Sequence, residues 1–98
     1  NEFAVQPRYK TVEKMIELIP PDVLVSVQVD IAPHIKPSDG RYIIPRNIEK
    51  SEFLLFDLKG NSYPLSKEEN LKIYNESKSS GNWELLKEAD GFALFKRK

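Results

Sequence analysis

Residues 23–29 have the sequence Val-Leu-Val-Ser-Val-Gln-Val, a nearly continuous run of β-branched and apolar side chains. A strand with one face in water alternates apolar and polar residues, whereas a strand covered on both faces is apolar almost throughout. The run therefore predicts a buried strand at the centre of a parallel or mixed sheet, within an α/β domain.

The residues before this strand predict a short helix. Thr11 can cap its start, and Pro20-Pro21 ends it. Residues 1–10 are expected to be a frayed lead-in. The apolar positions of the helix follow the three-then-four spacing of one helical face: Val12, Met15, Ile16 and Ile19.

The residues after the strand alternate between short helices and strands. Asp30 stands where the N-cap of a small helix over residues 31–35 belongs, and residues 41–44 and 52–58 have strand composition. Ser66 and Glu69 have the spacing of a capping box at the start of a second main helix.

The second main helix is expected to fade through residues 77–80, and Gly81 can take the left-handed conformation that ends helices. Asp90-Gly91 suits a two-residue turn between strands 83–89 and 92–96. With 98 residues there is room for one hydrophobic core. The sequence thus predicts one α/β domain over residues 1–98, a small sandwich. Its mixed sheet has a parallel core and about five strands, two main helices and a C-terminal antiparallel hairpin.

Composition excludes several classes of function. Fifteen basic residues balance fifteen acidic ones, so no net charge attracts nucleic acid, and we expect no nucleic-acid partner. There is no cysteine and no glycine pair in a G-x-G pattern, so thiol chemistry and a dinucleotide cofactor are not expected, nor is any other cofactor. No apolar run approaches the roughly 18 residues of a membrane span, so the domain itself is expected not to span a membrane.

The candidate site lies where the expected parallel strands end. Asp30 and Asp57 both follow strands, and His34 comes one helical turn after Asp30. Ligands of open α/β sheets bind outside the carboxyl ends of the strands, and two carboxylates with an imidazole can hold a metal ion or transfer protons. The alternative is structural: Asp30 caps a helix, Asp57 ends a strand, and His34 is a surface residue.

Aromatic side chains offer a different kind of site. Exposed aromatics can stack on sugars or peptides, whereas buried ones fill the core of a small domain. We expect Trp83 and Phe92 to be core residues. Tyr63, between Ser62 and Pro64 in a loop, is a candidate ligand-binding residue.

Five segments, in this order and spacing, resemble the C-terminal region of a large uncharacterised family of predicted membrane proteins, the domain of unknown function 2079. They are Ile19-Pro20-Pro21-Asp22, Ala32-Pro33-His34-Ile35, Ile44-Pro45-Arg46, residues 53–58 and residues 90–95, and the resemblance covers residues 11–97. In that family the region follows a multi-helix membrane part similar to glycosyltransferases that use lipid-linked sugars.

The resemblance implies that the chain was cut from a larger membrane protein. It implies a domain held at the membrane through its parent, on the extracytoplasmic side, with the parent's own membrane part as its partner. Three functions stay open: a non-catalytic accessory domain of that parent, a free-standing binding module with an aromatic patch around Tyr63 or Tyr42, and a small metal-dependent enzyme built on Asp30, His34 and Asp57. The sequence leaves the oligomeric state undetermined.

Overall fold

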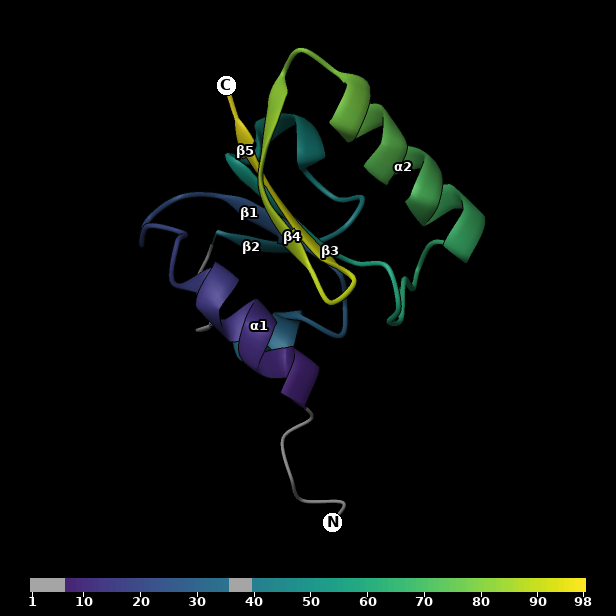
Figure 1. Cartoon of the computed structure of the whole chain (residues 1–98). Coiled ribbons are helices and arrows are strands. Elements are labelled where there is room, and N and C mark those ends of the chain that lie inside the picture. Colours follow the sequence, from purple (N-terminus) through teal and green to yellow (C-terminus); the bar gives the residue numbers. More distant parts are fainter. Residues whose placement is uncertain (1–6, 36–39) are drawn as a thin grey trace.

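The computed structural model describes residues 7–35 and 40–98 and has the predicted α/β architecture (Figure 1). Two helices accompany a mixed five-stranded sheet with a parallel core and a C-terminal antiparallel hairpin. The helices are α1 (Pro7–Ile16) and α2 (Lys67–Ser79), and two short 3-10 turns are η1 (Ala32–His34) and η2 (Ile48–Lys50). The strands are β1 (Val25–Val27), β2 (Arg41–Ile43), β3 (Phe53–Asp57), β4 (Trp83–Ala89) and β5 (Phe92–Arg97).

The strands lie in the order β2-β1-β3-β5-β4. β1 pairs in parallel with β2 on one side and with β3 on the other, while β5 pairs antiparallel with both β3 and β4. The predicted burial of β1 is confirmed, since its three residues are buried. β1 is also an interior strand with a neighbour on each side, as predicted, while the middle strand of the five is β3, whose five residues are all buried.

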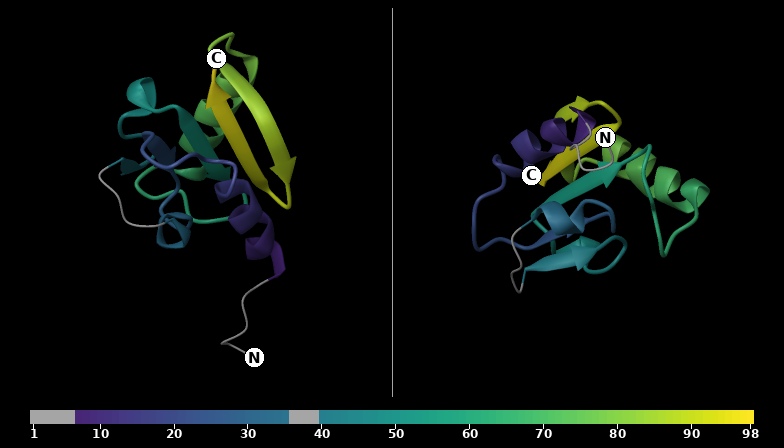
Figure 2. Two further views of the ribbon diagram at one scale, coloured as in Figure 1. Left: turned by 90° about the vertical axis from the view of Figure 1, so that its left-hand side faces the viewer. Right: turned by 90° about the horizontal axis from the view of Figure 1, so that it is seen from below.

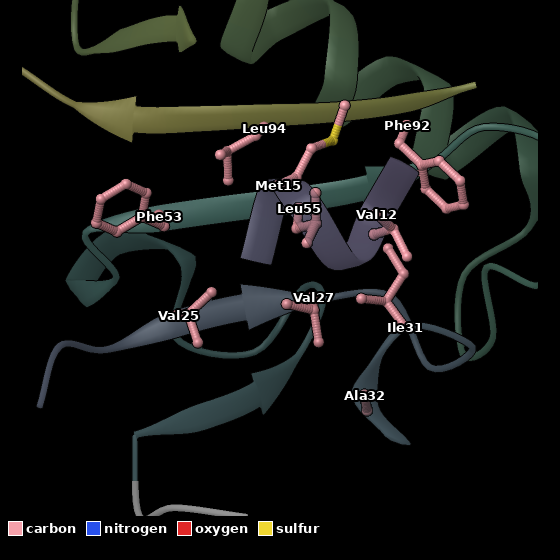
Figure 3. Packing of buried hydrophobic residues seen from close by; sticks show 10 residues of the cluster. All are labelled: Val12, Met15, Val25, Val27, Ile31, Ala32, Phe53, Leu55, Phe92 and Leu94. Atoms are coloured by element: carbon pink, nitrogen blue, oxygen red, sulfur yellow. The ribbon is translucent and has the colours of Figure 1, made fainter. Parts of the chain in front are cut away.

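Each face of the sheet carries one helix and one hydrophobic cluster (Figures 1 and 2). Alternate residues of β3 and β5 point to opposite faces, so each strand contributes to both clusters. The α1 face contains Val12, Met15, Val25, Val27, Ile31, Ala32, Phe53, Leu55, Phe92 and Leu94, and Figure 3 shows how they pack. The α2 face contains Ile44, Leu54, Phe56, Tyr74, Trp83, Ala93 and Phe95. The core interpretation of Trp83 and Phe92 is thereby confirmed.

The first helix differs from its prediction at both ends. It begins at Pro7 rather than at a Thr11 cap, and it ends at Ile16, so the expected frayed lead-in is wrong for residues 7–10. Proline is favoured in the first turn of a helix because its missing amide would have no partner there. Thr11, instead of capping, donates a hydrogen bond from its hydroxyl to the carboxylate of Asp90.

The second helix begins as predicted. The hydroxyl of Ser66 accepts from the Glu69 amide at 3.1 Å, and the Glu69 carboxylate accepts from the Ser66 amide at 2.9 Å, which completes the capping box. It ends at Ser79, within the predicted stretch, but the left-handed cap is wrong, because Ser80 is extended and Gly81 has no positive φ. No helix of residues 7–35 and 40–98 is long and apolar enough to cross a membrane.

The hairpin turn is confirmed. Asp90 and Gly91 have φ values of 55° and 85°, as a two-residue turn between twisted antiparallel strands requires.

Candidate functional site at the carboxyl ends of β1 and β3

β1 and β3 are adjacent parallel strands whose following segments leave in opposite directions. The chain after β1 leads to β2 at one edge of the sheet, and the chain after β3 leads to α2 and then β4 at the other edge. In open α/β sheets such a switch in direction opens a crevice where ligands bind. Asp57 is the last residue of β3, and Asp30 follows β1 by three residues, so both acids lie at this point.

Asp57 is fully buried and is held by Arg8 of α1. The two terminal nitrogens of Arg8 lie 2.5 Å from Oδ1 and 3.1 Å from Oδ2, and the Lys59 amide donates to Oδ1 at 3.0 Å. Two parallel bonds from one guanidinium are among the strongest polar contacts in proteins. Burial by itself raises the pKa of Asp57, but the bonds from Arg8, Asp30 and Lys59 outweigh burial and hold the pKa below its ordinary value.

Asp30 has the opposite environment. Both of its carboxyl oxygens are buried, and no group in the described part of the chain donates a hydrogen bond to either of them. Burial raises its pKa to about 7, aided by the hydrogen bond and the negative charge of Asp57. Two ionised carboxylates have no proton to donate, so Asp30 bonds to Asp57 only when it carries a proton. At mildly acidic pH, between the two pKa values, the pair is therefore a protonated Asp30 beside an ionised Asp57.

The predicted capping role of Asp30 is wrong. The turn η1 begins at Ala32, its cap position is Ile31, and no side chain makes a capping hydrogen bond there. Pro33 lies within the first turn of η1, so one amide that a cap would satisfy is missing. The carboxylate of Asp30 is therefore free to turn toward Asp57.

Gly60 covers the two carboxyl groups. A Cβ atom built at Gly60 would collide with Oδ2 of Asp30 and with Oδ2 of Asp57, and it would lie 2.7 Å from Cγ of Asp57. The two acids are thus neighbours beneath the backbone of Gly60. Any side chain at that position would displace them.

Gln28 fixes the backbone around the acids, and all of its bonding capacity is used. Its amide nitrogen donates to the carbonyls of Asp57 at 2.8 Å and Asn61 at 3.1 Å. Its amide oxygen accepts from the Asp57 amide at 2.6 Å and from the side chain of Asn70 at 3.0 Å. A buried polar group that is fully bonded specifies one arrangement of its surroundings. Gln28 therefore ties β1, the end of β3 and α2 together.

Sequence reasoning found neither Gln28 nor Arg8. A glutamine within a run of valines was the available signal for Gln28, because a buried strand position tolerates an amide only when a network satisfies it. Arg8 gave no such signal, since it lies in a segment expected to be frayed and its partner is 49 residues away.

His34 does not join the two acids. Its Nδ1 lies 3.7 Å from a carboxylate oxygen of Glu13, and its ring stacks on Tyr9 with 4.9 Å between centroids. Residues 7–35 and 40–98 hold no group of three acidic, histidine or cysteine side chains that could bind a metal ion. The structure therefore brings together Asp30 and Asp57, but not the three-residue site that a metal-dependent enzyme would use.

Tyr63 is 70% exposed, and hydrogen bonds hold the loop that carries it. Its amide donates to the side chain of Asn61 at 2.9 Å, and the Ser62 hydroxyl donates to the Leu65 carbonyl at 2.9 Å. The carbonyl of Asn61 is in turn held by Gln28, so the loop is connected to the network around the acids. Tyr42 is half-buried, with the guanidinium of Arg46 5.6 Å from its ring centroid, so Tyr63 is the exposed one of the two tyrosines.

The enclosure of the acid pair limits the chemistry that it can perform. A general acid or base must come within hydrogen-bond reach of its substrate. The Asp57 carboxylate is used by Arg8 and Lys59, and the Asp30 oxygens lie beneath Gly60, so neither acid offers an accessible oxygen. The two carboxyl groups therefore lie side by side inside the protein, beneath the loop that carries Gly60.

Comparisons with known proteins found no relative of this chain. No family model, no curated protein and no solved structure matches the chain.

Proposed function

We propose that this chain is a non-catalytic binding domain, and that it serves as an accessory domain of a multi-pass membrane protein. One observation carries the first part of this proposal. The acids at the switch point of the sheet are enclosed beside one another, and Asp57 is held by Arg8, so they support structure rather than catalysis.

The exposed ring of Tyr63 supports a binding role. An aromatic side chain with a polar end is suited to stacking on a sugar or packing on a peptide. Its loop is already held by Gln28 and Asn61, so little conformational entropy is lost when a ligand orders it. Tyr63 is therefore the residue we assign to the contact with a ligand or with the parent protein.

The membrane part of the proposal rests on the sequence resemblance over residues 11–97. It is supported by the five segments quoted above and by their order along the chain. In this proposal the domain lies on the extracytoplasmic side and positions a substrate or partner near a membrane part that resembles glycosyltransferases.

The first test of the proposal is to determine the full-length sequence that the reading frame encodes. Several spans of about 20 apolar residues upstream of Asn1 are the expected result. A frame without such spans contradicts the accessory role and leaves a free-standing binding module.

Photo-crosslinking in the full-length protein tests the contact itself. A photoreactive amino acid at position 63 is expected to crosslink to the parent's membrane part or to its substrate. The matched control is the same amino acid at Lys72, an exposed residue of α2. Equal crosslinking at both positions would show that Tyr63 is not a specific contact.

A further inference from the structure

β4 is a long strand at an open edge of the sheet. It has seven residues, whereas β2 at the opposite edge has three. Within the described residues β4 pairs with β5 alone, and Figure 2 (left) shows it at the rim of the sheet. An unpaired edge presents backbone amides and carbonyls that can bind another strand, and proteins that avoid this keep their edge strands short.

The middle of this edge is apolar. A shift in pairing between Leu85 and Lys87 leaves Leu86 as the inserted residue of a β-bulge, with 39% of its surface exposed. Bulges and charged residues on an edge strand prevent indiscriminate pairing, so a strand that pairs here has to match the charges on either side of this leucine. Leu86 also borders a groove of about 640 Å³, which it shares with Leu18, Pro20, Phe53, Glu52, Glu84 and Lys96. Leu18 adds a second exposed leucine to the groove, with 53% of its surface open.

Two charges flank this apolar centre. Glu84 and Lys87 are exposed, and neither forms an ion pair with another of the described residues. Their partners in β5 are Lys96 and Leu94, which are two residues apart, so Glu84 and Lys87 point to the same face of the sheet.

Two copies of β4 can pair antiparallel about a two-fold axis that passes between Leu85 and Leu86. In this pairing Glu84 of each copy lies opposite Lys87 of the other. The arrangement is self-complementary: it forms two opposite-charge pairs and places the leucines at its centre.

We propose that β4 is a self-association edge, which pairs antiparallel with β4 of a second copy of this chain and joins the two sheets into one. The exposed leucines of the edge and groove become buried, and Glu84 and Lys87 set the orientation. The inference is independent of the role of Tyr63.

Sedimentation equilibrium of the chain and of two charge-reversal variants tests the proposal. The wild-type chain is expected to dimerise below about 1 mM. Glu84→Lys and Lys87→Glu each place like charges opposite one another, and each is expected to weaken the dimer at least about tenfold. An equimolar mixture of the two variants is expected to restore dimers, because the two-fold arrangement then pairs opposite charges again.

The mixture separates loss of the interface from loss of folding, since mixing cannot refold a damaged variant. Lys72→Glu, an exposed change on α2, is the control and should dimerise like the wild type. A wild-type chain that stays monomeric at about 1 mM would overturn the proposal. So would single variants that dimerise as well as the wild type, or a mixture that stays monomeric.

Discussion

Arg8 and Asp57 are 49 residues apart in the sequence, yet two nitrogens of one guanidinium lie 2.5 and 3.1 Å from the two oxygens of the carboxylate. Arg8 also lies 4.4 Å from the ring centroid of Phe92, so it joins α1 to both β3 and β5. Asp57 is fully buried, whereas 23% of the Arg8 side chain is exposed. The pair connects the first helix of the chain to the middle strand of the sheet.

Replacing Arg8 by methionine should destabilise the protein by about 3 kcal/mol, because it leaves a buried carboxylate without its cation. The free energy of unfolding is measured with urea at pH 7. Lys10→Met is the control, since Lys10 is an exposed residue of the same helix. Equal effects of the two substitutions would show that the ion pair contributes nothing specific.

Because of the acid pair, we expect the free energy of unfolding to be largest at mildly acidic pH. The folded chain keeps the Asp30 proton up to a pKa of about 7, whereas the ordinary value is 3.8, so stability falls as the pH rises through this window. The pKa of Asp57 is lowered, so its contribution is present above 3.8 and is lost as the pH falls below that value. Urea unfolding across pH 3 to 9 measures the loss of stability on both sides of this maximum.

Asp30→Asn separates these two effects. Asparagine resembles the protonated acid, so the substitution should remove the loss of stability between about pH 4 and 7. The loss at lower pH, which comes from Asp57, should remain. We expect a gain of about 1 kcal/mol at pH 8, which is less than full linkage predicts because the residue as a whole is only half-buried, and little change at pH 4. An unaltered pH profile would contradict a raised pKa of Asp30.

Gly60→Ala should destabilise the protein by about 2–3 kcal/mol, because the new methyl group collides with both acids. Gly81 is the matched control, since a Cβ there has nothing within 4 Å. Thermal unfolding of both variants is compared with that of the wild type. If both alanine variants melt at the wild-type temperature, Gly60 does not cover the pair.

Ser66→Ala should lower the free energy of unfolding by about 1 kcal/mol, because it removes one half of the capping box. Ser79→Ala, in the exposed last turn of the same helix, is expected to have a smaller effect. Urea unfolding at pH 7 measures both. A larger loss from Ser79→Ala would contradict the assigned start of α2.

Local patterns predicted much of the fold. The valine run, the capping box at Ser66 and the turn at Asp90-Gly91 each have a short-range physical cause, and all three are present. The start of α1 was missed because Arg8 is held there by a residue of β3, which no local pattern reveals.

The sequence predicted where the candidate site lies, but not that its two acids are enclosed. Parallel strands place Asp30 and Asp57 at one edge of the sheet, and that much follows from their place after strands. Their enclosure depends on Gly60, Arg8 and Gln28, which tertiary contacts bring to the acids. His34 shows the reverse error, because sequence spacing placed it near Asp30 while its ring packs against Tyr9 of α1.

The most direct test is a carbon NMR titration of the aspartate carboxyl groups, recorded with and without Mg²⁺. We predict that Asp30 titrates with a pKa of about 7, that Asp57 titrates below its ordinary range, and that Mg²⁺ shifts neither resonance. If both acids titrate near the ordinary value of about 3.9, or if Mg²⁺ shifts them, the pair is open to solvent and the non-catalytic account is contradicted.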